Sequence, residues 1–334
     1  MVSIKDVASK AGVAVSTVSK VLNNYPNVTK ATKDKVNEAI AELGFVPNAV
    51  AAALSSKQST RVAILMNQSS QSQAIDEIDM QYLSGAIVKA RKLGLDVITL
   101  FFSMLKDKSS EEIISYLRSQ SITGLVIYGT SKNDREILKL AQCGGFKTVF
   151  VDAPIVNENT SCVWIDQKKA QYDVAHTLLE INGAKKMLYL AGKKNGFVTL
   201  PRIEGIKSLC AEKDIELTIR YGNFNERTAR EIAFESAREF DIIVCASDLM
   251  AIGVMRALTE MDVFRPVCGF DGITLMGYAG KQMYTVKQDF SKISENAFEE
   301  VYRLLKGEQG REMILPHKVL QIKYSDVLCQ PKGV

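Results

Sequence analysis

The sequence predicts two unlike parts, a small all-α head and a larger two-lobed α/β domain built on doubly wound parallel sheets. Two patterns lead to this prediction. The first sixty residues keep apolar side chains at helical spacing in three short segments, whereas later residues alternate short apolar runs with amphipathic stretches. At 334 residues the chain is long enough for two or three domains with substantial cores.

Three short helices are expected in the head. The first ends at Gly12, and the third begins at Thr29, a good N-cap residue, and stops at Gly44. Two short helices around a tight glycine turn, followed by a third, form a helix-turn-helix. The apolar faces of the three segments are Ile4, Val7, Ala8 and Ala11; Val18, Val21 and Leu22; and Val36, Ala39, Ile40 and Leu43.

Beyond Arg61, strands should alternate with helices, as they do in parallel, doubly wound sheets. The expected strands are 62–66, 95–101, 124–128, 148–151, 187–191, 216–221, 241–246, 267–270 and 319–324. The expected helices are 80–93, 109–119, 134–142, 170–182, 202–213, 226–239 and 250–259. These strands are too many for one ordinary sheet, and we therefore expect two similar lobes with a cleft between them.

Polar and turn-forming residues suggest where the domains divide. The head should occupy 1–46, and a hinge 47–60, in which Pro47 and Asn48 open a short alanine-rich helix ending near Leu54. Such a short helix is marginal alone, so its folding should be coupled to binding. The α/β domain should occupy 61–334. Because the stretch 153–161 reads as a crossing between lobes, we expect a first lobe at about 61–162 and 290–320 and a second at about 163–289 and 321–334.

Composition excludes several classes of protein. The six cysteines include no C-x-x-C pair and read as reduced core thiols, and the two histidines are isolated, so we expect no catalytic residues, no metal and no cofactor. No run of eighteen apolar residues and no signal-like N-terminus is present, which predicts a cytoplasmic protein without a membrane partner. Residues 1–60 hold seven lysines and no arginine against four acidic residues, a balance suited to binding a polyanion.

Candidate ligand-binding residues follow the apolar runs, because open parallel sheets bind ligands beyond the carboxyl ends of their strands. Carboxylates and a guanidinium can hold vicinal hydroxyls, and aromatic rings stack on the apolar face of a pyranose, so a sugar or sugar phosphate is the natural ligand. The residues placed this way are Tyr128, Asp152, Arg202, Phe224, Ser247, Asp248 and Asp271.

Five motifs in collinear order resemble the lactose-repressor and galactose-repressor (LacI/GalR) family of bacterial transcriptional regulators. They are IKDVASKAGVAVSTVSKVLNN (4–24), GFVPNAVAAAL (44–54), CASDLMAIGVMRAL (245–258), CGFDG (268–272) and TVKQDF (285–290). The resemblance implies a DNA-binding head and a sensor domain like a periplasmic binding protein. It also implies binding to a palindromic operator as a homodimer and repression of carbohydrate-utilisation genes that an effector relieves.

The resemblance also assigns roles to residues. Positions matching Val15, Ser16 and Lys20 read bases, those matching Thr17 and Ser19 contact phosphates, and Leu54 enters the minor groove as a wedge. Lys20 and Ala53 stand where relatives usually have arginine, and Ser247 where they have asparagine. The family pattern adds Asn23, Thr29 and Asn48 on the DNA side and Trp164 and Gln288 on the effector side.

Other readings of the chain remain open. A corepressor such as a nucleobase could tighten DNA binding instead of a sugar releasing it. A transporter's solute-binding protein shares the two-lobed cleft but would lack the head and carry an export signal. An enzyme would need a phosphate-binding glycine motif or a nucleophile with its base, and neither is found.

Overall fold

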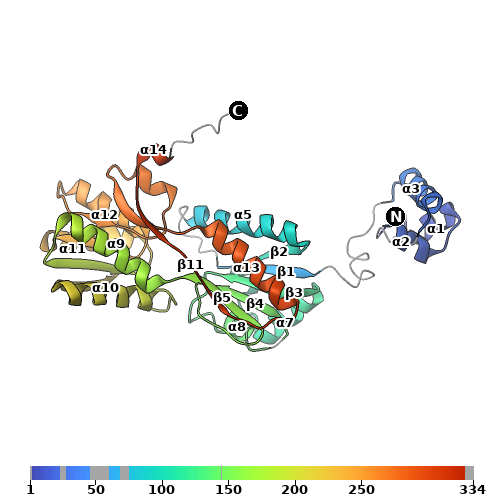
Figure 1. The fold of residues 1–334 in the computed structure, drawn as a ribbon, viewed down its shortest axis with the longest axis horizontal. Helices are drawn as coiled ribbons and strands as arrows, with labels where there is room; N and C mark the ends of the chain where they lie inside the picture. The colour runs from blue at the N-terminus through green and yellow to red at the C-terminus, as the bar shows by residue number, and fades with distance from the viewer. Residues whose placement is uncertain (1, 23–27, 46–59, 68–74, 144, 328–334) are drawn as a thin grey trace. The chain divides into compact units, whose positions relative to one another are not determined.

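The protein is described here by a computed structural model that covers residues 2–22, 28–45, 60–67, 75–143 and 145–327. It divides into two compact units, Met1–Ser59 and Thr60–Val334, each of which stands by itself (Figure 1). The predicted hinge residues Asn48 and Leu54, and Asn23 of the head, lie outside the described residues.

The first unit contains the three predicted helices, α1 (Ile4–Ala11), α2 (Val15–Leu22) and α3 (Lys30–Leu43). Gly12 and Gly44 end α1 and α3 in the left-handed region, with φ of 64° and 58°. The Thr29 side chain caps α3 by accepting a hydrogen bond from the Thr32 N–H. The core of this unit consists of Val7, Ala8, Val18, Val21, Val36 and Ala39.

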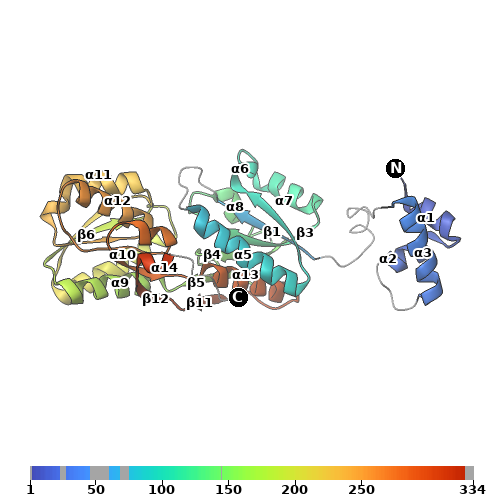
Figure 2. The same ribbon diagram turned by 90° about the horizontal axis from the view of Figure 1, so that it is seen from above.

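The first lobe of the second unit is a six-stranded sheet in which every neighbouring pair is parallel. In spatial order its strands are β11 (Glu312–Leu315), β5 (Thr160–Ile165), β4 (Lys147–Val151), β3 (Ile122–Tyr128), β1 (Arg61–Met66) and β2 (Asp96–Phe101). Its helices are α5 (Ile75–Leu93), α6 (Phe102–Leu105), α7 (Ser110–Ser119), α8 (Arg135–Lys139) and α13 (Phe290–Leu305). Helices α5 and α13 pack on one face, and α7 and α8 on the other (Figure 2).

The second lobe repeats this plan. In spatial order its strands are β12 (Lys318–Ile322), β10 (Met283–Lys287), β9 (Val267–Cys268), β8 (Ile242–Cys245), β6 (Lys186–Ala191) and β7 (Glu216–Tyr221). Only β12 is antiparallel to its neighbour. Its helices are α9 (Gln167–Asn182), α10 (Thr199–Lys213), α11 (Glu226–Ser236), α12 (Asp248–Glu260) and α14 (Tyr324–Val327), with 3-10 turns η1 (Ala237–Glu239) and η2 (Thr274–Tyr278). Figure 2 shows α9 and α10 on one side of this sheet and α11 and α12 on the other.

The chain crosses between the lobes at other places than the sequence suggested. The stretch 153–161 is no crossing, because β5 follows it and pairs with β4 in the same sheet. The three crossings lie after Ile165, between Lys287 and Phe290, and between Leu315 and Lys318. The first lobe therefore extends past 162, and β12 belongs to the second lobe from Lys318 rather than from 321.

The α/β class with parallel sheets is confirmed, while β5, β10, β11 and helix α13 were not among the expected elements. No helix among the described residues is long and apolar enough to span a bilayer.

Candidate functional site

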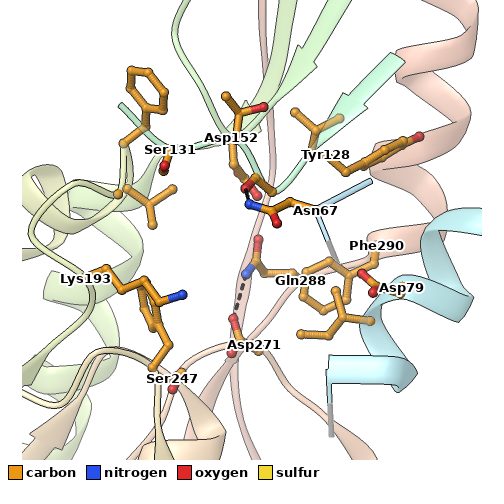
Figure 3. A pocket seen from close by; sticks show the side chains of 18 of the residues that line it. Asn67, Asp79, Tyr128, Ser131, Asp152, Lys193, Ser247, Asp271, Gln288 and Phe290 are labelled. Atoms are coloured by element: carbon orange, nitrogen blue, oxygen red, sulfur yellow. Dashed lines mark hydrogen bonds between the residues drawn. The ribbon is translucent and has the colours of Figure 1, made fainter. Parts of the chain in front are cut away.

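A cavity of about 350 Å³ lies where the carboxyl ends of the strands of both lobes face each other (Figure 3). Tyr128 and Asp152 border it from the first lobe, and Ser247 and Asp271 from the second. This is the position that the rule for open parallel sheets predicts. Seven of the nine predicted effector residues line the cavity: Tyr128, Asp152, Arg202, Phe224, Ser247, Asp271 and Gln288.

Arg202 is a buried cation in this wall, with 4% of its surface exposed. Its Nε donates to Gln167 Oε1 (2.8 Å) and its Nη1 to the Ala246 carbonyl (2.5 Å). The guanidinium lies over the Phe270 ring, with Cζ 3.6 Å from the ring centroid. Burial lowers the pKa of Arg202, and the nearby Asp271 carboxylate opposes that effect. The two hydrogen bonds use two of the five N–H groups of the guanidinium and fix its orientation in the cavity wall.

Asp152 connects the two lobes through hydrogen bonds. It has a φ of 61°, in the left-handed region, directly after β4. Its Oδ1 accepts from Gln167 Nε2 (3.0 Å) and its Oδ2 from the Tyr82 hydroxyl (3.4 Å). Burial raises the pKa of Asp152, and Arg202 opposes the rise. Because Gln167 begins α9, the series Tyr82, Asp152, Gln167, Arg202 joins the first lobe to the second.

Asp271 is the second carboxylate of the cavity. Burial raises its pKa well above the ordinary value, while Arg202 lowers it and the neighbouring Asp248 raises it further. Gln288 Nε2 donates to Asp271 Oδ1 at 3.1 Å, the contact drawn in Figure 3. Gln288 Oε1 and Thr130 Oγ1 are buried and have no hydrogen-bond partner among the described residues. Both residues line the cavity, so these two oxygens are free to pair with polar groups of a molecule bound there.

Aromatic rings form the apolar part of the cavity wall. The Tyr82 ring lies 4.6 Å from that of Tyr128 and 5.2 Å from that of Phe290, between centroids. Phe224 lies across from them with a φ of 57°, and its ring covers Gly192 so closely that a Cβ there would come within 2.0 Å of it. Such walls suit a ligand with apolar ring faces and polar edges.

Trp164 does not line the cavity, contrary to what the family resemblance implied. Along β5 the side chains alternate, and Val163 and Ile165 belong to the main core, so Trp164 points to the opposite face of the sheet. Its indole Nε1 is buried without a hydrogen-bond partner among the described residues.

Asp248 is also not a cavity residue, although its sequence position suggested one. It is fully buried as the first residue of α12. Its Oδ2 accepts from the backbone N–H groups of Gly272 (2.7 Å) and Ile273 (2.8 Å), and its Oδ1 from the Thr285 hydroxyl (2.6 Å). Burial raises its pKa to about 6 in spite of these donors. Asp248 thus fixes the turn that carries Asp271.

Several cavity residues were missed by the sequence analysis. Asn67 follows β1, and Lys193 and Asn195 follow β6, so the strand-end rule could have found them. The Lys193 ammonium points toward the cavity in Figure 3. Asp79 and Tyr82 enter from helix α5, and no strand-end signal marks them.

In the head, helix α2 presents the predicted contact residues on its outer side. Val15 is 40% exposed, Ser16 and Lys20 are exposed, and Thr17 and Ser19 are half-buried. Thr29 is exposed beside the first N–H groups of α3, which carry the positive end of the helix dipole. No cluster of three or more potential metal ligands occurs in the parts of the chain that the structure describes.

Comparison with known proteins covers both units. Residues 3–48 match the family of bacterial regulatory proteins named lacI, and residues 69–309 match the periplasmic binding protein domain. The chain is 27% identical to the HTH-type transcriptional regulator MalR of Clostridium butyricum, over 96% of this chain and 98% of that protein. It is 27% identical to the HTH-type transcriptional repressor PurR of Vibrio vulnificus, over 92% and 93%.

Among solved structures, the fold matches that of the Lac repressor bound to ONPG in the repressed state. The TM-score is 0.80 at 24% identity, covering 96% of this chain and 98% of that one.

Proposed function

The chain belongs to the lacI family of bacterial regulatory proteins and is a DNA-binding transcriptional regulator, not an enzyme, and we propose on this basis which small molecule controls its binding to DNA. We propose that the protein represses carbohydrate-utilisation genes and that a sugar or sugar phosphate releases it from its operator. A repressor of bacterial genes acts on the chromosome, so we expect it in the cytoplasm.

The lining of the cavity supports a sugar. Two carboxylates, Asp152 and Asp271, stand on opposite lobes with Arg202 between them, and Thr130 and Gln288 offer buried oxygens that need partners. A ring carrying several hydroxyl groups supplies both donors and acceptors to such a set, which a purely apolar ligand would leave unpaired. This arrangement is the observation that carries the proposal.

A corepressor such as a nucleobase is the second candidate. The Tyr82 and Tyr128 rings, which are tilted by 41° to each other, and the Gln288 amide would suit a planar heterocycle, and one of the relatives is a repressor named PurR. The two candidates have opposite effects on operator binding, because an inducer weakens it and a corepressor strengthens it.

On the DNA side we expect Val15, Ser16 and Lys20 of α2 to read bases in the major groove, and Thr17, Ser19 and Thr29 to contact phosphates. Asn23, Asn48 and Leu54, which lie outside the described residues, are also expected to contact the DNA. Leu54 would enter the minor groove as an apolar wedge.

A homodimer is expected because a palindromic operator mirrors a two-fold axis. An exposed apolar stripe on α5 supports it, since Met80, Ile87 and Val88 are 63%, 59% and 43% exposed and follow helical spacing. In the second lobe, Phe264 and Tyr278 are 61% and 59% exposed.

A gel-shift titration tests the proposal. Purified protein is titrated on palindromes upstream of its own and neighbouring genes, at fixed moderate salt, and the titration is repeated with a panel of sugars, sugar phosphates and nucleobases. We expect a specific shift that one carbohydrate abolishes. A nucleobase that tightens the shift would replace the sugar by the corepressor, and no response to any sugar would sink the carbohydrate assignment.

A further inference from the structure

Glu77, near the start of α5, makes a contact between the two lobes at the rim of the cavity. Both carboxylate oxygens accept a hydrogen bond from the Thr274 N–H, each at 2.9 Å, and Oε1 also accepts from the Thr274 hydroxyl at 2.7 Å. Gln81 Nε2 donates to the same Oε1 at 3.3 Å. Thr274 is the first residue of η2 in the second lobe, so this carboxylate ties one lobe to the other.

The segment that carries Thr274 is fixed to the second lobe. Asp248 accepts from the N–H groups of Gly272 and Ile273, and Lys287 Nζ donates to the Gly272 carbonyl at 2.7 Å. Gly272 has a φ of 77°, and a Cβ there would come within 2.4 Å of the Lys287 side chain. Residues 271–274 therefore move with their lobe, carrying Asp271 in the cavity at one end and Thr274 at the other.

Helix α5 is fixed to the first lobe in the same way. A Cβ at Gly85 would come within 2.1 Å of the Ser291 carbonyl oxygen, so α5 and α13 touch backbone to backbone. Ser291 Oγ also donates to the Gln81 carbonyl at 3.0 Å. Glu77 is thus held at a defined position relative to the first lobe, and its contact with Thr274 depends on the angle between the lobes.

A second contact joins the lobes at another part of the rim. Ser131 and Gly196 form a β-bridge, and the Lys132 N–H donates to the Asn195 carbonyl at 2.9 Å. In Figure 3, Ser131 and Lys193 lie on one side of the cavity and Asp79 of α5 on the other. Rigid lobes held at both sides cannot open without breaking both contacts.

We propose that Glu77 is a positioning residue that latches Thr274 and holds the two lobes closed around the cavity. It does not line the cavity itself, and its effect on a bound molecule comes through the closed population of the lobes. The inference deepens the proposed function and rests on it for the role of closure in sensing. The contact itself requires no assumption about the effector.

Hydrogen exchange of the full chain, without sugar or DNA, tests the latch. In Glu77→Ala we expect exchange at least tenfold faster in the peptide containing Thr274 and, through opening of the lobes, also in the peptide containing Lys132. Glu77→Gln keeps one acceptor oxygen for the Thr274 N–H and should give an intermediate result. Glu204→Ala, which removes an exposed glutamate of α10, is the matched control and should change neither peptide.

Faster exchange at Thr274 with unchanged exchange at Lys132 would show a local contact and overturn the proposal, as would no change at either. If Glu77→Ala loses protection throughout β1, Thr274→Val is used instead, because it removes only the hydroxyl donor. In this variant the peptide containing Lys132 should exchange faster than in the wild type, but by a smaller factor. Unchanged exchange of that peptide in Thr274→Val would overturn the latch. The experiment contains no sugar, so a failed sugar panel removes the carbohydrate effector and leaves this result standing.

Discussion

Asp248 shows how a carboxylate inside the second lobe supports the cavity from behind. Its three donors are the N–H groups of Gly272 and Ile273 and the hydroxyl of Thr285, all close to Asp271. The sequence position after β8 correctly placed Asp248 near the strand ends. It could not reveal that α12 turns this first side chain inward, because that depends on the turn at 271–273, which is distant in sequence.

Replacing Asp248 separates the charge from the hydrogen bonds. In Asp248→Asn the amide oxygen can accept from both N–H groups and the amide nitrogen can donate to Thr285 Oγ1. Asp248→Ala leaves the buried Ile273 N–H unpaired and leaves the Gly272 N–H only its longer contact with Thr285 Oγ1, at 3.2 Å. We expect Asp248→Ala to lower the free energy of unfolding by about 3 kcal/mol and Asp248→Asn by about 1 kcal/mol or less. Urea unfolding at pH 7.5 measures both, and equal losses would contradict the assigned hydrogen bonds.

Comparing the wild type with Asp248→Asn also predicts how the free energy of unfolding depends on pH. The native pKa of Asp248 is raised to about 6, above an unfolded value of about 3.9, so the folded state binds the proton more tightly. The contribution of this group is therefore fully present below about pH 4 and is lost as the pH rises through 6. Between pH 4.5 and 7.5, the wild type should lose about 2 kcal/mol relative to Asp248→Asn. Parallel pH profiles in urea unfolding would refute this.

Arg202 is a residue whose geometry matters more than its charge. A lysine ammonium does not reproduce the fixed positions of Nε and Nη1 from which Arg202 donates to Gln167 and to the Ala246 carbonyl, and it does not stack on Phe270 as a planar group. In Arg202→Lys we expect at least tenfold more of the releasing sugar to be needed in the gel shift, with operator affinity in its absence unchanged. Arg220→Lys, in an exposed pair with Glu235, is the control. An unchanged sugar response in Arg202→Lys would remove Arg202 from the effector site.

At the scale of elements, three helix pairs depend on one glycine each. Gly85 meets the Ser291 carbonyl between α5 and α13, Gly205 meets that of Lys168 between α10 and α9, and Gly253 meets that of Glu226 between α12 and α11. In each case a Cβ would come within 2.2 Å of the carbonyl oxygen. These helices cover the sheets that position the cavity, so their close approach sets its shape.

Adding one carbon at this contact should therefore be costly. In Gly85→Ala we expect a loss of about 1–3 kcal/mol in the free energy of unfolding, because α5 must move away from α13. Ser84→Ala, the exposed neighbour on the same helix, should change it by less than about 0.5 kcal/mol. Thermal and urea unfolding of both variants measure this, and equal stability would mean that the helices adjust without strain.

The sequence predicted most elements but not how they connect. Strong apolar runs marked β1, β3, β6 and β8, whereas β11 and β10 were missed, because short strands with partly exposed residues lack a clear run. The crossing was misplaced because turn-forming residues at 153–159 look alike whether they link lobes or adjacent strands. Only the pairing of β5 with β4, which is not local, settles this point.

For the whole molecule, the exposed stripe on α5 predicts an assembly. If this face pairs with a second copy of the chain, charged side chains introduced at Met80 and Ile87 would have to be buried in the interface. We expect Met80→Glu/Ile87→Glu to be monomeric in analytical ultracentrifugation under conditions where the wild type is a dimer, and to bind the operator at least tenfold more weakly. Val156→Glu, at a 44% exposed apolar residue outside the stripe, is the control. A dimeric double variant would exclude this face.

The three crossings have a consequence for the response to ligands. Ile165 pairs with Leu315 and Lys287 with Lys318, so the crossings lie side by side as a narrow strip, and the lobes can rotate about it but cannot slide apart. With the proposed effector, we therefore expect ligand analogues to differ in the angle at which they stop the rotation, and not only in how tightly they bind. An analogue too bulky for full closure should act as a partial agonist, giving at saturation a plateau of operator release that no higher dose can exceed.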